Sequence, residues 1–336
     1  MVLTIITAII VFGILVILHE AGHFFAAKSV GIRVNEFAIG MGPIIFRKKN
    51  GETEYSLRAL PLGGFVKMEG EDEESYDERS FNAKPIFAKI LVLVAGSAMN
   101  FIFAILIMIT LFSVTGFPTN DNIIGEVVAG NPAEEAGIQT GDEIINIEGT
   151  EINTWEDIVG VITASTGEQI HITLRRNGEI IELDSNIMVE NGRRIIGILQ
   201  TKEFSFKRAV VEGTKYSFML VGAMLNFFVI LFRGQASSND VVGPVGIIHL
   251  VGEAARMGPV YVANFTAMIS MNLAVINLLP FPALDGGRLL LLVVQGITGK
   301  KIDPEKEGFI HFIGFVILIG LMIFVTFKDF DRFIFK

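Results

Sequence analysis

The chain has 336 residues, of which 51% are hydrophobic and 19% are charged, and its mean hydropathy is +0.55. This composition favours a membrane protein over an ordinary soluble one, and the formal net charge of −9 argues against nucleic acid as a partner. The absence of cysteine excludes disulfides, thiolate metal ligands and a cysteine nucleophile. A metal ion would therefore need histidine and carboxylate ligands.

Three apolar runs reach the length of about 20 residues that a membrane-spanning helix needs. They occupy residues 2–27, 86–114 and 309–327. A fourth run, 260–284, carries three asparagines and two prolines, and a fifth, 216–232, is shorter and follows a mixed stretch. The first run has no basic segment before it and no small-residue cleavage site, so we expect it to remain as an anchor. The pattern predicts a polytopic α-helical membrane protein with about four transmembrane helices.

Two histidines and a glutamate interrupt the first apolar run, in the sequence HEAGH at residues 19–23. Polar groups are costly at membrane depth and usually mark a functional site. On a helix, His19 and His23 lie on one face and can bind the same metal ion, and Glu20 is placed to take a proton from a water molecule that the metal activates. The alternative, a structural pair of histidines that contact neighbouring helices, must account for three costly groups on adjacent turns.

A catalytic zinc site usually has three protein ligands and leaves the fourth position for water. The best candidate for the third ligand is Asp285, in the sequence NLLPFPALDGGR at residues 277–288. We expect Asp285 to end an apolar helix, as the histidines do in the first run. We expect His171, His249 and His311 to be structural rather than metal ligands.

The middle of the chain has a soluble character, with short β-like runs and an Asn177–Gly178 hairpin turn. Its sequence IIGEVVAGNPAEEAGIQTGDEIINIEGTEINTWEDI resembles a PDZ domain of the bacterial protease type. Such a domain binds an extended peptide by adding it as a strand beside an edge strand. The resemblance implies one α+β PDZ domain, and we expect its peptide-binding edge strand to contain Ile124, Gly125, Glu126 and Val127. The alternative is a globular spacer that binds no ligand.

The sequences HEAGH and NLLPFPALDGG, with the PDZ-like region and a GPVGI sequence between them, resemble the site-2 protease family of intramembrane zinc metalloproteases, in its bacterial RseP-like branch. The resemblance spans nearly the whole chain. It implies that Zn2+ is bound by His19, His23 and Asp285, that Glu20 is the general base, and that Asn277 holds the substrate or the transition state. The best-studied branch has two tandem PDZ domains, whereas one is visible here.

The sequences FAIGMGPIIF and RALPLGGFVKMEG also match this family, and the second corresponds to its membrane-dipping β-loop. We expect residues 55–68 to form a hairpin that turns at 61–64 and lines a cavity, where non-helical backbone is tolerated at membrane depth. Its strand edge would bind an unwound substrate. The expected substrate-binding residues, besides Asn277, are Gly63, Gly64, Phe65, Val66 and Lys67. The alternative is a loop that only packs against the spans.

The site residues constrain the topology. His19 and His23 lie near the end of the first span, so Asp285 reaches them only if residues 260–284 start on the side of the PDZ-like domain. Residues 216–232 then do not cross, and we expect them to lie in the interface or to pack against the PDZ-like domain. Lys and Arg follow the runs at 2–27 and 260–284, which predicts a cytoplasmic zinc site and an extracytoplasmic PDZ domain. The expected location is the bacterial cytoplasmic (inner) membrane, in a multi-pass topology.

This topology predicts four parts of the chain. They are an N-terminal membrane half with the HEAGH helix and the β-loop at residues 1–116, the PDZ domain at 117–187, a linker with an interfacial helix at 188–259, and a C-terminal membrane half at 260–336. We expect the acidic run at 69–78 to be a solvated linker.

Two functions of different class fit these features. The first is an intramembrane zinc metalloprotease that hydrolyses peptide bonds within transmembrane segments of single-span membrane proteins after their ectodomains have been shortened. In the family, such substrates include anti-sigma factors and remnant signal peptides. The second is a non-proteolytic PDZ adaptor, anchored in the lipid bilayer, with a structural metal site. Glu20 favours the enzyme, because a structural metal site has no use for a base. A soluble-type zinc protease tethered to the membrane is disfavoured, because HEAGH lies inside the span.

Overall fold

The computed structural model describes residues 2–71, 75–190, 192–235, 241–299 and 303–333. The chain forms two compact units. The membrane unit comprises residues 1–111 and 210–336, and the PDZ unit comprises residues 112–209.

Among the described residues, five helices are long and apolar enough to cross a membrane. They are α1 (Val2–Ser29), α2 (Ile86–Thr115), α5 (Phe206–Phe232), α7 (Pro259–Asn277) and α9 (Pro304–Phe333). The shorter helices α6 (Pro244–Met257) and α8 (Asp285–Thr298) flank α7 in the sequence. A helix satisfies its own backbone N–H and C=O groups, which hydrocarbon cannot do. The prediction of a polytopic α-helical membrane protein is confirmed.

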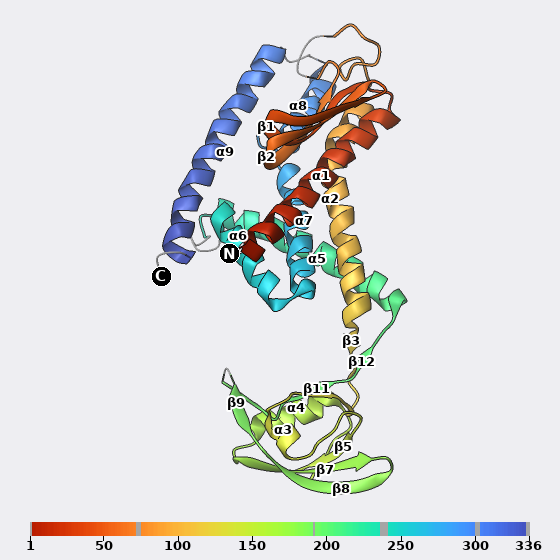
Figure 1. Cartoon of the computed structure of the whole chain (residues 1–336), viewed down its shortest axis with the longest axis vertical. Coiled ribbons are helices and arrows are strands. Elements are labelled where there is room, and N and C mark those ends of the chain that lie inside the picture. The colour runs from red at the N-terminus through yellow and green to blue at the C-terminus, as the bar shows by residue number, and fades with distance from the viewer. Residues whose placement is uncertain (1, 72–74, 191, 236–240, 300–302, 334–336) are drawn as a thin grey trace. The chain divides into compact units, whose positions relative to one another are not determined.

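Helix α5 differs from the prediction for residues 216–232. It is one continuous helix that starts at Phe206 and includes the mixed stretch with Lys207, Glu212 and Lys215. By length and composition it is a fifth candidate span. Figure 1 shows α5 running across the view, whereas α1, α2, α7 and α9 run more nearly along its vertical axis.

The segment after α1 forms a β-hairpin of β1 (Val34–Asn50) and β2 (Thr53–Met68). The expected turn at 61–64 is wrong, because the chain reverses at Gly51 and Glu52, where Gly51 has a φ of +61°. Residues 34–50 also belong to the sheet, and their alternation is obscured in the sequence by glycines and a proline.

Both strands of the hairpin bend. Their pairing gives a sheet of four segments in the order 64–68, 34–39, 53–58 and 44–50. Glycine permits the bends, since Gly40 and Gly63 have φ values of +86° and +76°, which other residues rarely adopt. The sheet therefore has two outer segments, 44–50 and 64–68, and within the described residues each pairs along one edge.

Asp285 begins α8 instead of ending α7, contrary to the prediction. Helix α7 ends at Asn277, and residues 278–284 form a turn. Pro280 and Pro282 explain the break, because proline lacks the N–H that would continue the helical hydrogen bonds and restricts the residue before it.

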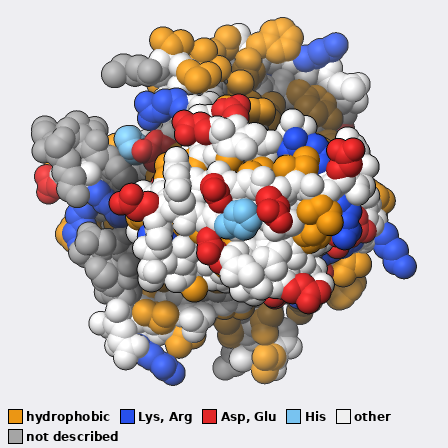
Figure 2. Space-filling model, turned by 90° about the horizontal axis from the view of Figure 1, so that it is seen from below, with side chains coloured by type: hydrophobic (Ala, Val, Ile, Leu, Met, Phe, Trp, Pro, Cys, Tyr) orange, Lys and Arg blue, Asp and Glu red, His pale blue; other side chains and the backbone are white. Residues whose placement is uncertain are grey.

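The PDZ unit is an α+β domain around an isoleucine-rich core. Its antiparallel sheet has the order β6 (Thr150–Glu151), β5 (Glu143–Ile147), β7 (Gln169–Arg176) and β8 (Glu179–Asn186), and its helices are α3 (Pro132–Glu135) and α4 (Trp155–Ala164). Hairpin β7–β8 turns at Asn177 and Gly178, as predicted, with φ values of +52° and +88°. The face seen in Figure 2 carries acidic and basic side chains together, with a histidine among carboxylates.

Residues 188–203, expected to be a linker, contribute strands to the PDZ unit. The pairs are β3 (Phe117–Pro118) with β12 (Lys202–Glu203), β4 (Ile124–Val127) with β11 (Ile198–Gln200), and β9 (Met188–Glu190) with β10 (Arg193–Ile195). The pairs β3–β12 and β4–β11 join segments more than 70 residues apart in the sequence, so a local sequence pattern does not predict them. The PDZ unit therefore extends beyond residue 187.

Candidate active site

His19 and His23 lie one turn apart near the C-terminal end of α1, and their Nε2 atoms are 3.2 Å apart. The Nδ1 atom of His23 is 2.8 Å from the carbonyl oxygen of Val92 in α2. Because a carbonyl can only accept, we assign the proton of His23 to Nδ1, which leaves the Nε2 lone pair for a metal. A backbone contact thus fixes both the tautomer and the orientation of this ring.

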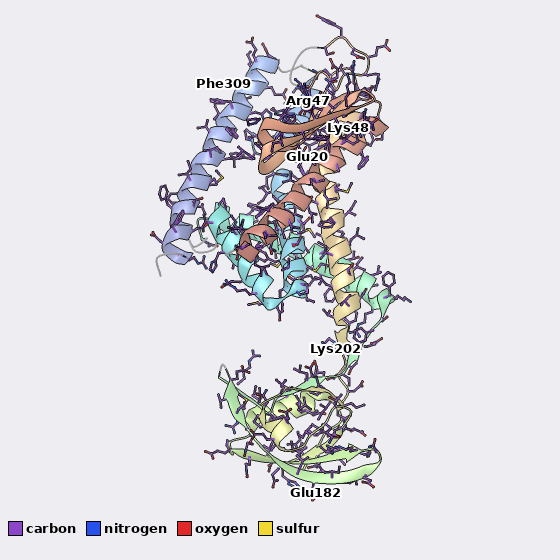
Figure 3. The ribbon with its side chains drawn as sticks, in the orientation of Figure 1. Glu20, Arg47, Lys48, Glu182, Lys202 and Phe309 are labelled. Carbon is purple, nitrogen blue, oxygen red and sulfur yellow. The ribbon has the colours of Figure 1, made fainter. Side chains whose placement is uncertain are left out.

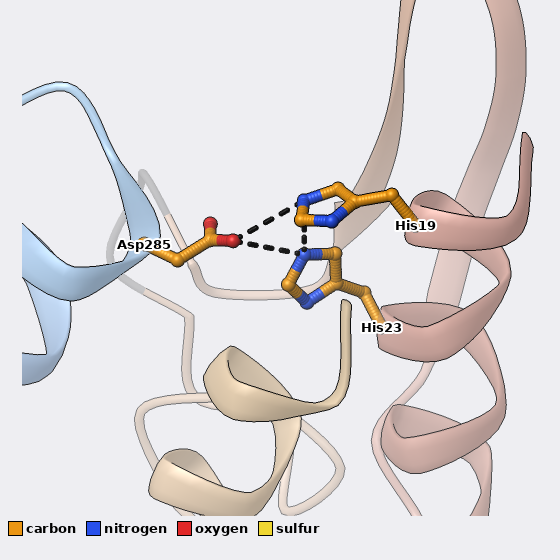
Figure 4. Close-up of side chains that lie close together, drawn as sticks. All are labelled: His19, His23 and Asp285. Atoms are coloured by element: carbon orange, nitrogen blue, oxygen red, sulfur yellow. Dashed lines mark hydrogen bonds and ion pairs between the residues drawn. The ribbon is translucent and has the colours of Figure 1, made fainter. Parts of the chain in front are cut away.

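Asp285, the first residue of α8, completes a cluster with the two histidines (Figure 4). Its Oδ2 atom is 3.2 Å from Nε2 of His19 and 3.4 Å from Nε2 of His23. His19, His23 and Asp285 are the residues that the sequence analysis expected to be the metal ligands. Asp285 comes from the start of a helix and not from the end of one.

The chemistry of this donor set fits zinc. Two imidazole nitrogens and one carboxylate oxygen lie within 4.8 Å of one another. Oδ2 of Asp285 is a buried oxygen with no hydrogen-bond donor from the protein. Three protein ligands of this kind leave the fourth tetrahedral position for water, which is the arrangement of catalytic zinc sites.

Asn277 ends α7 beside the same cluster, with Nδ2 3.4 Å from Nε2 of His19. Its amide is therefore within reach of a group bound at the metal position. The resemblance to the family expected Asn277 near the zinc ligands, and in the structure it lies beside His19, which is 258 positions away in the chain.

The family model of peptidase family M50 matches residues 7–321 of this chain. The chain belongs to peptidase family M50. The regulator of sigma-W protease RasP of Bacillus subtilis is 32% identical over 98% of this chain and 98% of its own. The zinc metalloprotease RasP of Geobacillus kaustophilus is 31% identical over 98% of both chains.

A protein of Clostridium acetobutylicum named as a zinc metalloprotease is 41% identical over 97% of this chain and 96% of its own. Among solved structures, the PDZ domain of an SdrC-like protein from Listeria monocytogenes is 20% identical and covers 24% of this chain and 85% of its own, with a TM-score of 0.22. The M50 membership makes this chain a zinc metalloprotease of the site-2 protease family.

Gly96 of α2 is a part of the M50 site that sequence reasoning missed. A Cβ atom at position 96 would lie 2.3 Å from Nε2 of His23 and 2.8 Å from Cε1 of His19. Gly22 of α1 allows the same close approach of α1 and α2, because a Cβ there would lie 2.3 Å from the carbonyl oxygen of Ala95. Small residues let membrane helices approach closely, and the run of small residues around position 96 was the available signal.

The outer segment 64–68 of the M50 sheet passes beside Glu20. A Cβ at Gly64 would lie 3.1 Å from Cγ of Glu20 and 3.2 Å from Cγ1 of Val16. Figure 3 shows Glu20 of α1 beside the hairpin. The structure thus brings part of the predicted substrate-binding segment to the predicted base.

Side chains of this segment have different surroundings. Val66 is buried and packs in a cluster with Ile32 and Val34, so its side chain faces the protein. The ring of Phe65 lies 4.9 Å from the guanidinium of Arg58. The backbone edge, rather than this set of side chains, is what segment 64–68 offers.

The turn before Asp285 is held by α9. Ala283 has a φ of +75°, and its N–H donates a hydrogen bond of 2.9 Å to Nδ1 of His311. A Cβ at Gly314, one turn further along α9, would lie 2.4 Å from the carbonyl oxygen of Pro282. His311 was expected to be structural, and its contact is with the turn that positions the metal ligand.

Strand β4 of the PDZ unit, where the peptide site was predicted at Ile124–Val127, is paired along one side and engaged at its first residue on the other. On one side it pairs with β11, and a Cβ at Gly125 would lie 2.2 Å from the carbonyl oxygen of Gln200. On the other side the N–H of Ile124 donates to the carbonyl oxygen of Asp142 at 2.8 Å. Within the described residues β11 pairs only with β4, so its far edge is the candidate for strand addition.

Proposed function

We propose that this M50 zinc metalloprotease hydrolyses peptide bonds within the transmembrane segments of single-span membrane proteins after their ectodomains have been shortened. The main support for this proposal is the position of the candidate zinc ligands in the helices. His19 and His23 belong to α1, an apolar helix of 28 residues, and Asp285 joins them from α8. A scissile bond must therefore reach the site at the depth of an apolar helix.

Each polar residue of the site has one task in this reaction. His19, His23 and Asp285 would hold Zn2+, which would serve as a Lewis acid for water and for the scissile carbonyl. The carboxylate of Glu20 accepts the proton of the attacking water and returns it to the leaving amide nitrogen. The amide of Asn277 donates a hydrogen bond to the negative charge that develops on the carbonyl oxygen.

A transmembrane substrate must lose its helical hydrogen bonds before it is cut, because helix and bilayer both protect the peptide bond. The outer segment 64–68 offers unpaired backbone groups that replace those bonds when the substrate adds as a strand. Since Gly64 lies against the turn of α1 that carries Glu20, a strand added there would pass the base.

The orientation follows from the positive-inside rule and from the direction of the helices. Lys28 lies in the last turn of α1, Arg33 follows that helix, and Arg288 follows α7, so we place the zinc site toward the cytoplasm. The PDZ unit, which follows α2, is then extracytoplasmic. Helix α5, which runs across the others in Figure 1, lies in the interface.

The PDZ unit would select substrates by the edge of β11, which binds an exposed C-terminus as an added strand. Ectodomain shortening creates such a C-terminus. The name of the Bacillus subtilis relative supports a membrane-bound regulator of a sigma factor as one substrate class, and remnant signal peptides are the other.

The test uses purified protein and tagged single-span substrates with complete or shortened ectodomains. We expect cleavage inside the transmembrane segment of the shortened forms and little cleavage of the complete ones. Bound zinc without cleavage of any substrate would instead support a PDZ adaptor with a structural metal site.

A further inference from the structure

The sheet of the membrane unit has a second outer segment, residues 44–50, on the edge opposite to the one beside Glu20. Every residue from 41 to 50 is exposed. Ile45 and Phe46 are 67% and 60% exposed.

The chemistry of segment 44–50 changes along its length. It starts with Ile44, Ile45 and Phe46 and continues with Arg47, Lys48 and Lys49. With about 3.3 Å per residue, the cations reach roughly 10 Å beyond the apolar residues. The segment is thus apolar at one end and cationic at the other.

The cationic end lies at the level of the end of α1. Asn50 leads into the turn at Gly51 and Glu52, and Glu52 is 2.5 Å from Nζ of Lys28, in the last turn of α1. The apolar end leads back to the bend at Gly40, whose neighbour Ile39 pairs with Gly64. In Figure 3, Arg47 and Lys48 lie higher in the view than Glu20.

Several other cations of this region are paired with carboxylates. Arg79 and Lys28 both contact Glu52, at 2.7 and 2.5 Å, and their hydrogen bonds lower the pKa of Glu52 to about 2. Arg58 pairs with Glu36 at 2.7 Å.

Arg47, Lys48 and Lys49 differ from those neighbours. In the part of the chain that the structure describes, none of the three takes part in an ion pair, although Glu54 lies opposite Lys49 in the pairing register. Three adjacent cations without an ion pair thus stand beside three exposed apolar residues. A bilayer surface has the same two zones, because lipid phosphates lie above the acyl chains.

We propose that segment 44–50 binds anionic phospholipid headgroups through Arg47, Lys48 and Lys49, while Ile44, Ile45 and Phe46 enter the acyl layer. The segment then anchors one edge of the sheet in the bilayer, and the opposite edge, 64–68, stays at the depth of Glu20. Cations on an open edge also discourage pairing with another strand, which favours lipid over a second copy of the chain.

The test measures the affinity of the detergent-solubilised full-length protein for a fluorescent short-chain phosphatidylglycerol and for the matching phosphatidylcholine. The variant replaces Arg47, Lys48 and Lys49 together by Gln. The control replaces Lys207, Lys215 and Lys306 by Gln, which removes the same charge from exposed positions of other helices.

Each cation near an anionic surface contributes about a fivefold change in affinity, so we expect the variant to lose between tenfold and roughly a hundredfold of the preference for phosphatidylglycerol. The control should keep that preference, and added salt should weaken it in the wild type. A variant that keeps the preference, or a wild type insensitive to salt, would overturn the proposal even if the triple variant folds poorly.

The absence of cysteine permits a second readout. A single cysteine introduced at Phe46 should react with a lipid-soluble reagent and should not cross-link two copies in vesicles. Efficient cross-linking between copies would show instead that segment 44–50 pairs with a second chain.

Discussion

Gly96 of α2 lies so close to His23 of α1 that a Cβ at position 96 would be 2.3 Å from the metal-facing Nε2. Gly96→Ala should therefore displace the imidazole and weaken zinc binding by about tenfold or more, with a stability cost of about 1–3 kcal/mol from overpacking. Zinc affinity is measured by competition with a chelator. Gly13→Ala, in the same kind of helix but with nothing within 4 Å of its Cβ, is the matched control and should bind zinc normally.

His311 should act as a positioning residue for Asp285. In His311→Phe the N–H of Ala283 loses its acceptor, and the turn at φ +75° loses the contact that holds it. Loss of such support around metal ligands costs about 10–100-fold in metal affinity. The spectrum of the Co2+-substituted protein should report the altered ligand geometry.

A second substitution separates positioning from general packing. Ala283→Gly relieves the cost of positive φ, so adding it to His311→Phe should restore part of the metal affinity. If His311→Phe binds zinc as tightly as the wild type, the contact does not position Asp285.

Proline substitutions test the substrate edge. A proline at Phe65 or at Lys67 removes a backbone N–H from the outer segment 64–68 and should reduce proteolysis while zinc remains bound. The matched control is a proline at Ile45, on the opposite outer segment. Equal activity of all these variants would show that the sheet does not hold the substrate.

The PDZ unit should respond to pH through His171. The carboxylate of Asp184, 2.8 Å away, raises the pKa of His171 above its usual 6.5. A raised pKa in the folded state means that the protonated form stabilises the fold below pH 6.5, and that this contribution is lost as the pH rises through the folded pKa.

Trp155, the single tryptophan of the chain, is 8% exposed in the PDZ core and reports the unfolding of this unit within the full-length protein. Its thermal transition should fall as the pH rises from about 6 to about 9, and His171→Gln should flatten this dependence. The same slope in the variant would assign the effect to other groups.

Much of the site was predictable because its signals are local. Histidines four residues apart in a helix share a face whatever surrounds them, so HEAGH pointed to a metal in an apolar run. Asp285 was expected as the third ligand of the histidine pair and Asn277 was found through the resemblance of its motif, but the two prolines between them were not read as a break, and Asp285 was placed on the wrong helix.

The rest depends on contacts between distant segments. The pairing of β4 with β11 occupies one side of the strand that the sequence offered for peptide binding, and the approach of Gly96 to His23 arises only when two helices pack. The hairpin turn was misplaced for a related reason, since five glycines and two prolines from residue 40 to residue 64 allow several turns and only pairing selects Gly51.

A comparison of the wild type with Glu20→Gln and Asp285→Ala tests whether Glu20 is the base of an intramembrane zinc protease. The measurement is cleavage of a shortened single-span substrate by each purified protein, together with its zinc content. We predict that only the wild type cleaves the substrate, that Glu20→Gln retains zinc, and that Asp285→Ala loses zinc or binds it more weakly. Substantial cleavage by Glu20→Gln with zinc bound would contradict this prediction.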